Sequence, residues 1–441
     1  MNPIIPTVYS ADPSAHIWDD QNTLWIYASN DEPGTNTHDS MSSYHVFSTT
    51  DMVHWTDYGC VLSLENVSWA VSHMWAIDAA YRHGTYYLIF CAVEEATGMF
   101  RTGVATSKNP QGPFVDQGFI EGVEWGQDPA LFVDDDDTPY LYWGAGGSCF
   151  ACELTDDLMH VVPGTIVDLT KQLTWVYEGP FVHKYEGKYY LTYPGLYENK
   201  WPEHMYYAVA EKPLGPFQFR GEYIPVFEGQ AGTNHGSVIQ FKGKWYAFHH
   251  SSWMSGISES RSLMCDYVVY DEKGDILPIF PNKEGVHSTE DETDHTSKVT
   301  IWLDAAGAPN MQGKLSGTTI GTEIPGYTGD GYVEHFAGAH FGFTVMAQSS
   351  IEYTCNLKIR YCAPDGPCTK KIMFNNVLIC PKDEGPDSYD KLLSFDQASD
   401  WTTVTIDQVK LRVGQNFIRF YNGSGEIKVD AVILEQAQEI K

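Results

Sequence analysis

Five titratable residues occupy matching places in a repeated pattern along this chain: Asp12, Asp78, Asp128, Glu178 and His235. Two carboxyl groups on either side of a sugar-sized pocket can hydrolyse a glycosidic bond, because one donates a proton to the leaving oxygen while the other, ionised, activates water. A third carboxylate nearby keeps the acid protonated, since like charges resist joint ionisation. The set therefore indicates carboxylate chemistry, because so many like charges would only destabilise a purely structural channel.

Three of these residues stand out by their neighbours. Asp12 in "ADPS", Asp78 in "MWAIDAA" and Glu178 in "YEGPF" are flanked by small or aromatic residues, as suits a partly desolvated site. The run "DDDD" (134–137) is different, because it falls between two strand-like segments, and we expect a solvated turn there.

The elements that must position these residues are short β-strands. A turn residue followed by an aromatic-rich strand segment recurs five times, with another short strand before it and a third after it. The intervals of about 50 to 66 residues between the titratable positions are typical of propeller blades. The sequence therefore predicts an all-β fold, a five-bladed β-propeller whose innermost strands aim the five residues at one axis. The aromatic segments are 22–29, 84–90, 137–144, 187–193 and 243–250.

The repeat stops before a polar, charged stretch without periodicity at 282–298. Beyond it, strands of regular spacing with no helical runs indicate a small β-sandwich of the jelly-roll kind. We expect a propeller domain over 1–285, a linker over 286–298 and the β-sandwich over 299–441.

Composition limits the partners. The net charge of −31 argues against nucleic acid and anionic membrane surfaces as partners. No apolar run approaches the roughly 20 residues of a membrane helix, and "MNPIIPTVYS" does not read as a signal peptide. We expect a cytoplasmic protein, or a secreted one whose signal peptide is absent from this chain. The nine cysteines indicate reduced thiols, and "CFAC" (149–152) lies within an alternating β segment, which does not favour a redox role.

The segments "YSADPS", "WAIDAA" and "YEGPF", in this order and spacing, resemble the motifs of glycoside hydrolase family 43, a family of five-bladed propellers. The resemblance spans roughly residues 5 to 285. It implies that Asp12 is the general base, Asp78 the residue that modulates the pKa of the acid and orients it, and Glu178 the general acid. One departure is Ile77, where the family usually has Pro.

The resemblance extends to further candidate residues, each with a structural alternative. Asp128 in "WGQDPAL" copies the first motif and binds substrate, or it holds a blade turn. His235 resembles a central histidine that coordinates calcium largely through water, or it is a hydrogen-bonded core residue. Arg261 faces the substrate, or it forms a surface ion pair. Trp75 and Trp125 wall the pocket, or they pack between blades.

The C-terminal segment resembles a carbohydrate-binding module of family 6 or the related family 35, on "GYTGDGYVEHF", "KIRYCA" and "IKVDAVIL". This implies a structural calcium near Asp430 and sugar stacking on Tyr327, Tyr332 or Trp401. The alternatives are that Trp401 belongs to the core and that the module only packs against its neighbour.

Taken together, these features predict an inverting exo-glycosidase that acts on plant cell-wall polysaccharide of the xylan type, as an α-L-arabinofuranosidase, a β-xylosidase or both. The chemistry needs no cofactor, and calcium is expected only as a structural ion. Two alternatives stay open: a sugar-binding propeller without turnover, and a relative that acts on arabinan or galactan. Asp12 weakens the galactan alternative, because some such relatives lack the base. The oligomeric state is open.

Overall fold

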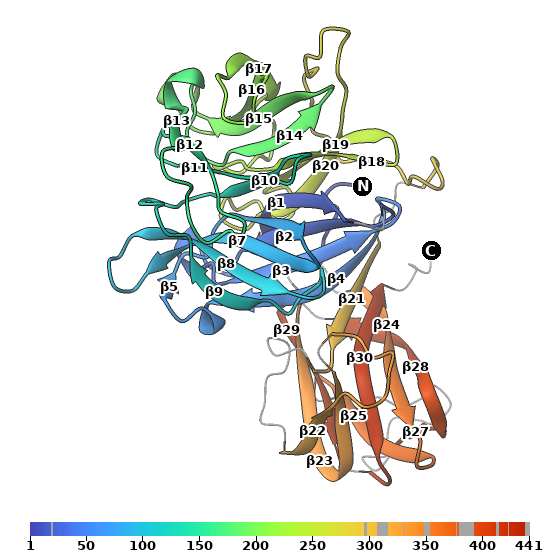
Figure 1. The fold of residues 1–441 in the computed structure, drawn as a ribbon. Coiled ribbons are helices and arrows are strands. Elements are labelled where there is room, and N and C mark those ends of the chain that lie inside the picture. The colour runs from blue at the N-terminus through green and yellow to red at the C-terminus, as the bar shows by residue number, and fades with distance from the viewer. Residues whose placement is uncertain are drawn as a thin grey trace. The chain divides into compact units, whose positions relative to one another are not determined.

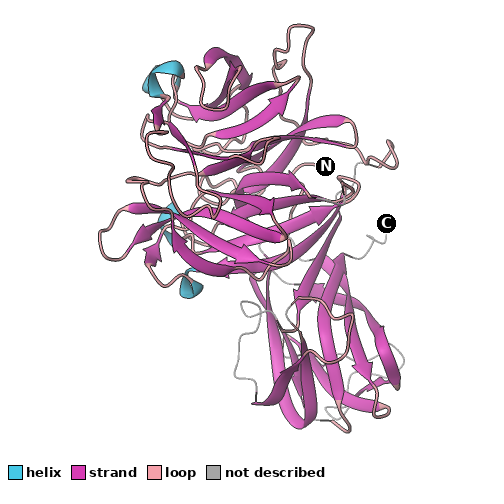
Figure 2. Ribbon diagram, viewed as in Figure 1, coloured by secondary structure: helices cyan, strands magenta, loops and turns pink. Residues whose placement is uncertain are grey.

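The computed structural model describes residues 1–18, 21–294, 298–306, 316–329, 331–347, 353–375, 377–378, 392–411, 414–421 and 423–436. It divides into two compact units, Met1–Trp55 with Val61–Ser297 and Thr56–Cys60 with Lys298–Lys441. Strands dominate both units (Figures 1 and 2). The helices among the described residues are single 3₁₀ turns: η1 (His38–Ser40), η2 (Leu64–Asn66), η3 (Thr170–Gln172) and η4 (Tyr197–Asn199).

The first unit is built around five antiparallel blades, formed by strands β1 to β20. Within every blade the strands pair in chain order from the innermost to the outermost, except that β5 and β6 both pair with β7. The blades are, in order, β1 (Ser10–Ile17), β2 (Leu24–Asn30), β3 (Ser43–Thr49) and β4 (His54–Ser63); β5 (Ala70–Ser72), β6 (Ile77–Arg82), β7 (Thr85–Glu94), β8 (Phe100–Ser107) and β9 (Val115–Phe119); β10 (Ala130–Val133), β11 (Pro139–Trp143), β12 (Phe150–Glu153) and β13 (Val167–Asp168); β14 (Phe181–Tyr185), β15 (Lys188–Gly195), β16 (His204–Ala210) and β17 (Gln218–Ile224); β18 (Ser237–Phe241), β19 (Lys244–Ser251) and β20 (Ser262–Val268).

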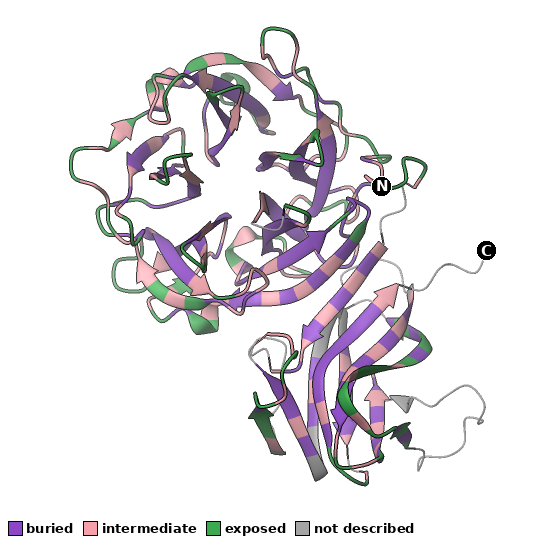
Figure 3. Ribbon diagram, turned by 45° about the vertical axis from the view of Figure 1, so that its right-hand side comes forward, coloured by how far each residue is buried: buried purple, intermediate pink, exposed green. Residues whose placement is uncertain are grey.

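The inner strands β1, β6, β10, β14 and β18 contact one another in a closed ring, which Figure 3 views face-on. The N-terminal segment fastens the first blade to the last. Ile4 donates its N–H to the Leu263 carbonyl at 2.9 Å, and the Asn2 side chain exchanges two hydrogen bonds with the Cys265 backbone, at 2.9 and 3.1 Å. The prediction of a five-bladed propeller is thus confirmed.

The aromatic second strand of each repeat builds the core between neighbouring blades. Leu191 and Tyr193 of β15, for example, pack in one apolar cluster with Tyr142 and Ala151 of the third blade. These strands alternate buried side chains toward the two flanking blades, so their aromatic content reflects packing on both faces.

The segment predicted as a linker, 286–298, differs from that expectation in its described part. Val286 and Ser288 are buried, Thr289 donates its N–H to the Asp51 carbonyl at 2.8 Å, and the His287 N–H bonds to the Tyr267 hydroxyl at 3.0 Å. These contacts make residues 286–294 part of the propeller unit. Low periodicity misled the prediction because the segment packs through single residues, without a regular element.

The second unit is a β-sandwich, as predicted. The strand β23 pairs with β22 and β30 through its first half and with β29 through its second half, so it passes from one sheet to the other. In the described part of the chain no helix has the length and apolarity to span a membrane. The strands are β21 (Lys298–Asp304), β22 (Ser316–Gly321), β23 (Tyr332–Ala347), β24 (Tyr353–Ala363), β25 (Cys368–Phe374), β26 (Val377–Leu378), β27 (Leu393–Phe395), β28 (Ala398–Leu411), β29 (Gly414–Tyr421) and β30 (Ile427–Gln436).

Candidate active site

A cavity of about 520 Å³ opens where the N-terminal ends of the inner strands converge. Each of the five blades contributes at least one residue at or just before its inner strand, and the volume lies in the range of small-molecule sites. The lining residues are Asp12, His38, Met41, Trp75, Ala76, Trp125, Gln127, Asp128, Ala145, Gly146, Ser148, Phe150, Tyr177, Glu178, Trp201, Thr233, His235 and Arg261.

Asp12 reaches this cavity through a local irregularity of β1. The pairing of β1 with β2 shifts register between Ala11 and Ser14, and Asp12 has φ +53°, a left-handed conformation that residues other than glycine seldom adopt. Ser29 of β2 donates its hydroxyl to the carboxylate at 2.6 Å. The bulge therefore turns a residue of a buried strand toward the axis, and strain of this kind is common at functional sites.

The carboxylate of Asp12 is held in its ionised form. Burial alone would raise its pKa, but the guanidinium of Arg261, at 3.1 Å, and the hydrogen bond from Ser29 hold the pKa well below its usual range. Arg261 is itself buried and fixed by Asp31, which takes two hydrogen bonds from the guanidinium at 2.8 and 3.0 Å and one from the Arg261 backbone N–H at 2.7 Å. The fixed cation keeps Asp12 ionised, which is the state that a general base must have before it can take a proton.

His250 supports Asp12 from behind. Its Nε2 donates to the Thr233 carbonyl at 3.0 Å, so its Nδ1 accepts the backbone N–H of Asp12 at 3.2 Å. Burial lowers the pKa of His250 well below its usual value, with Arg261 acting in the same direction. The ring is therefore neutral and orients the strained backbone of Asp12. The sequence prediction missed Asp31, which lies outside the repeated segments, and His250, which ends one of them where the other repeats have no histidine.

Glu178, which precedes β14, has the opposite electrostatic environment. Burial raises its pKa well above the usual value, and the negative charges of Glu203 and Asp12 act in the same direction. The chain turns sharply at Gly179, with φ +53°, where a Cβ would stand 2.8 Å from Nδ1 of His235. Only glycine allows this close approach, so the "EGP" motif brings Glu178 against the axis, in surroundings that favour the protonated form of its carboxyl.

Asp128, just before β10, lies next to Glu178. It shares the left-handed backbone of Asp12, with φ +49°, and like Asp12 it is followed by proline. Burial raises its pKa well above the usual value, and the charges of Glu178 and Asp12 add to this, while a hydrogen bond from the Gly179 N–H opposes it. Asp128 is thus the third carboxyl of the cavity.

Asp78 does not line the cavity, which corrects the role predicted for it. Its carboxylate accepts hydrogen bonds from the Ser14 hydroxyl, from Nε2 of His16 at 2.7 Å and from the Leu131 N–H at 2.6 Å. It therefore joins the inner strands β1, β6 and β10 within the channel. We conclude that Asp78 is a structural residue and that Asp128 occupies the place predicted for it.

The pairing of the inner hairpins explains this error. Tyr185 pairs with Lys188 at the end of the β14–β15 hairpin, and Arg82 pairs with Thr85 at the end of β6–β7. Glu178 lies seven residues before Tyr185 (185 − 7 = 178), and the residue seven positions before Arg82 is Trp75 (82 − 7 = 75). Trp75 is therefore the match of Glu178 in the second blade, and it does line the cavity. Alignment by residue type had displaced the second blade by three positions.

Comparison with known proteins agrees with this geometry. The sequence model described as glycosyl hydrolases family 43 matches residues 1–276. The chain belongs to glycoside hydrolase family 43. It is 33% identical over 332 residues to Xylosidase/arabinosidase 43A of Humicola insolens, covering 63% of this chain and 98% of that protein, and 32% identical over 323 residues to a xylosidase/arabinosidase of Bacteroides ovatus, covering 63% and 96%.

Among solved structures, a family 43 β-xylosidase/α-arabinofuranosidase from a compost microbial metagenome, in complex with xylotriose, superposes with a TM-score of 0.58 at 30% identity. It covers 64% of this chain and 98% of its own. An arabinoxylan arabinofuranohydrolase of Bacillus subtilis, at 23% identity and a TM-score of 0.58, covers 99% of this chain and 97% of its own. The second likeness shows the fold alone, and it includes the β-sandwich.

The four other residues predicted for this family 43 site are all found at the cavity. Arg261, His235, Trp75 and Trp125 all line the cavity. Trp75 donates its indole N–H to the His38 carbonyl at 2.9 Å, and the exposed Trp125 packs against Phe100. The sequence prediction missed the opposite aromatic wall, Tyr177 and Trp201, whose rings meet edge to face at 5.2 Å.

Glu203 is a further carboxylate that the sequence prediction did not single out. It is fully buried beside β16; one oxygen accepts the Asn234 N–H at 2.6 Å, and the other has no hydrogen-bond partner among the described residues. Burial raises its pKa well above the usual value, as do the charges of Asp128 and Asp12. A buried carboxyl without a full set of hydrogen-bond partners destabilises the fold, so we expect Glu203 to have a role beyond packing.

The predicted calcium sites find little support in the residues present. Calcium takes six to eight oxygen ligands, and His235 belongs to no close group of three His, Cys, Asp or Glu side chains among the described residues. Asp430 is occupied by an ion pair with Arg360 and by the Thr328 N–H and hydroxyl. A calcium held by His235 through water stays a prediction, and the contacts of Asp430 do not favour a cation there.

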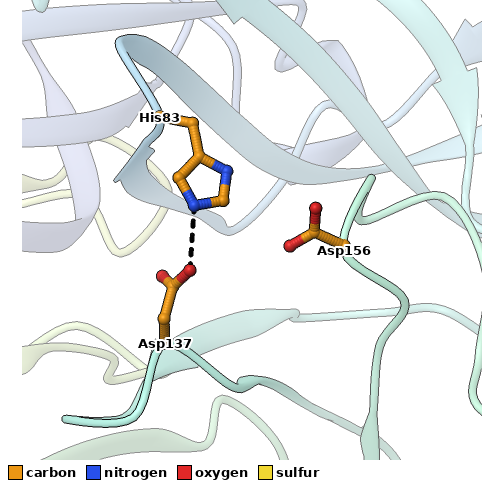
Figure 4. Close-up of side chains that lie close together, drawn as sticks. All are labelled: His83, Asp137 and Asp156. Atoms are coloured by element: carbon orange, nitrogen blue, oxygen red, sulfur yellow. Dashed lines mark hydrogen bonds and ion pairs between the residues drawn. The ribbon is translucent and has the colours of Figure 1, made fainter.

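One such group does exist at the propeller surface: His83, Asp137 and Asp156 (Figure 4). His83 Nε2 lies 2.9 Å from Asp137, and the guanidinium of Arg82 bonds both carboxylates, at 3.0 and 2.8 Å. The arginine already supplies the positive charge, so this group is an ion-pair cluster. The "CFAC" thiols are equally inert: every described cysteine is free, and burial raises the pKa of Cys152 to about 12.

Proposed function

We propose that this family 43 enzyme is an inverting exo-glycosidase that releases α-L-arabinofuranosyl or β-D-xylosyl units from xylan-type polysaccharide. One observation carries the proposal: a single cavity holds Asp12 with a lowered pKa and Glu178 with a raised pKa. Carboxyl groups whose environments push their pKa values apart are the acid and base of a glycosidase. The names of the relatives, xylosidase and arabinosidase, support a pentose as the released sugar.

The roles follow from these electrostatics. Asp12 accepts a proton from water as the water attacks the anomeric carbon, and Glu178 donates its proton to the leaving oxygen as the glycosidic C–O bond breaks. Asp128 keeps Glu178 protonated by charge repulsion, and Arg261 fixes the charge of Asp12. Proton count and charge balance, because one proton enters Asp12 and one leaves Glu178. The attack from the face opposite the leaving group inverts the anomeric configuration.

The cavity also favours a terminal, neutral sugar. It is walled by aromatic rings that suit the C–H faces of a pentose, and its charged groups serve the reacting centre. The two pentoses present similar hydroxyl groups, so one cavity can accept both. The name of each of these two relatives combines the two activities, which supports a dual specificity.

We further propose that the β-sandwich binds the polysaccharide. Trp401 is partly exposed, with its indole N–H on the Pro325 carbonyl at 3.0 Å and Arg360 over one ring face at 5.3 Å. Tyr332 is fully buried, so it belongs to the core, while Tyr327 is partly exposed. Trp401→Ala should weaken retention on insoluble xylan and leave turnover of nitrophenyl sugars unchanged, because anchoring raises only the local concentration of polymer.

A panel of nitrophenyl glycosides tests the function directly. We expect hydrolysis of the α-L-arabinofuranoside, the β-D-xyloside or both, and an inverted first product by NMR. Binding of xylo-oligosaccharides without any turnover would indicate the sugar-binding alternative. A preference for arabinan or galactan oligosaccharides over xylan-derived ones would assign the enzyme to the other polysaccharides.

A further inference from the structure

The aromatic wall of the fourth blade continues beyond the cavity. Tyr177 and Trp201 line the cavity, and Trp175 and Tyr197 do not. Trp175 meets Tyr197 edge to face at 4.8 Å and packs on Phe219 of the outermost strand β17 at 6.0 Å. Three of these rings are exposed to solvent, Trp201 by 53%, Tyr197 by 43% and Trp175 by 40%. The four residues, here called the blade-four track, come from two short stretches of this blade, 175–177 and 197–201, with one pair at the cavity and the other packed toward the outermost strand.

The backbone holds the track in place. Residues 175–177 pair with the end of β15, since Tyr177 donates its N–H to the Pro194 carbonyl at 3.0 Å and Leu196 donates to the Trp175 carbonyl at 2.9 Å. Gly195 permits this approach, because a Cβ there would lie 2.3 Å from the Trp175 carbonyl oxygen. Trp175 itself has φ +58°, an uncommon conformation for a bulky residue. A strained, tied segment that keeps large apolar rings in solvent is a sign of binding rather than of packing.

The chemistry of the site assigns a direction to the track. The acid must stand beside the leaving oxygen, and the base must act from the opposite face of the sugar. Glu178 lies on the fourth blade, between Tyr177 and the strand β14, whereas Asp12 lies on the first blade. The leaving group must therefore depart along the fourth blade, where the track begins.

We propose that the blade-four track binds the leaving-group side of the substrate, a chain of neutral, β-linked pentose units that continues from the scissile bond. Aromatic faces stack on the C–H faces of neutral sugars, and Lys200 beside them is paired with Glu198 at 2.8 Å, so these two charges neutralise each other. The track thereby favours long substrates over short ones. This inference rests on the proposed function, because it takes Glu178 to be the acid.

The test compares kcat/KM across substrate length. Wild-type enzyme, Trp175→Ala, Trp175→Phe and a matched control, Phe280→Ala, are assayed on a nitrophenyl pentoside and on linear xylo-oligosaccharides of two to six units. Phe280 is the more exposed ring, at 73%, and lies away from the track in the sequence. We expect Trp175→Ala to lose about two- to tenfold more on the longest substrate than on the nitrophenyl sugar. Trp175→Phe should recover much of that loss, and the control should match wild type.

The outcomes separate the two proposals. An equal loss on short and long substrates, or no loss on either, would overturn the track while leaving the function intact. Failure of the wild-type enzyme to hydrolyse any nitrophenyl pentoside would remove the proposed function, and the track with it. Thermal unfolding of each variant guards against misfolding, because the ratio of long to short substrate is read within one folded sample.

Discussion

The acidic turn of the third blade, Asp134–Asp137, and the cavity both gather carboxylates, but they differ in their supply of cations. In the turn, Lys184 bonds Asp134 at 2.7 Å and Arg82 bonds Asp137 at 3.0 Å, so each neighbouring blade contributes a cation. In the cavity, the single Arg261 is shared between Asp12 and Asp31, and Asp128, Glu178 and Glu203 form no ion pair among the described residues. The matched charges of the turn stabilise the contact between blades, whereas the unmatched carboxyls of the cavity have raised pKa values.

The largest loss of activity is expected from substitutions of the two reacting groups, Asp12 and Glu178. Asp12→Asn removes the base, so kcat/KM should fall by roughly 10²–10⁴ whatever the leaving group. Glu178→Gln removes the proton donor, so its loss should be as large for a sugar leaving group but much smaller for a nitrophenol, which departs with little acid help. Steady-state kinetics on both substrate types measures this. Equal losses of Glu178→Gln on the two substrates would contradict its role as the acid.

Substitutions of Asp128 and Asp78 should have different effects, because we assign Asp128 to the active site and Asp78 to the structure of the propeller. Asp128→Asn removes a carboxyl that resists joint ionisation with Glu178, so the pKa of Glu178 should fall and the alkaline limb of the pH–rate profile should move to lower pH. Asp78→Asn should leave that limb in place and instead lower the free energy of unfolding by about 1–3 kcal/mol, because one carboxylate oxygen that accepts a buried hydrogen bond is lost. Should Asp78→Asn shift the limb and Asp128→Asn not, the reassignment made above is wrong.

These two residues also show what a sequence can and cannot reveal. The repeat of aromatic strands was enough to predict five blades, because each repeat carries its own turn and packing signals. It did not fix the register within the second blade, where "WAIDAA" offered an aspartate three positions from the true match, Trp75. A better signal was present: Asp12 and Asp128 are each followed by proline and share the left-handed backbone, while Asp78 has neither feature.

Other parts of the site depend on contacts between distant segments. The Asp31–Arg261 pair joins residues 230 positions apart, and His250 reaches Asp12 across 238 positions. The aromatic rings of the fourth blade, Tyr177 and Trp201, look like core residues in the sequence, since most aromatic residues of a propeller are buried. Only the three-dimensional arrangement distinguishes the exposed rings from the packed ones.

Glu203 offers an intermediate effect. Among the neighbouring charges, that of Glu203 raises the pKa of Glu178 the most. Glu203→Gln should therefore move the alkaline limb of the pH–rate profile to lower pH, in the same direction as Asp128→Asn. The neutral amide can keep the hydrogen bond with the Asn234 N–H, so the fold should tolerate the change. The pH dependence of kcat/KM between pH 4 and 9 is the measurement. An unshifted limb with unchanged kcat would reduce Glu203 to a structural role.

The smallest effect is expected at the acidic turn. Lys184→Ala breaks the ion pairs with Asp134 and Asp135, of which the second is largely exposed, so the loss should be at most about 1 kcal/mol and should shrink in high salt. Burial alone would raise the pKa of Asp134, but hydrogen bonds from Lys184 and Tyr189 outweigh this effect and lower it.

A carboxyl whose pKa is lowered on folding stabilises the fold above its ordinary pKa, and this contribution disappears as the pH falls through the lowered value. The stability difference between wild type and Lys184→Ala should therefore be full at neutral pH and vanish in acid, with turnover unaffected throughout. Thermal unfolding across pH and salt tests this, with Lys244→Ala, which breaks an exposed pair with Glu292, as the control expected to show almost no change. A loss of activity in Lys184→Ala would mean that the turn and the cavity are coupled, and the contrast between a structural and a catalytic set of carboxylates would fail.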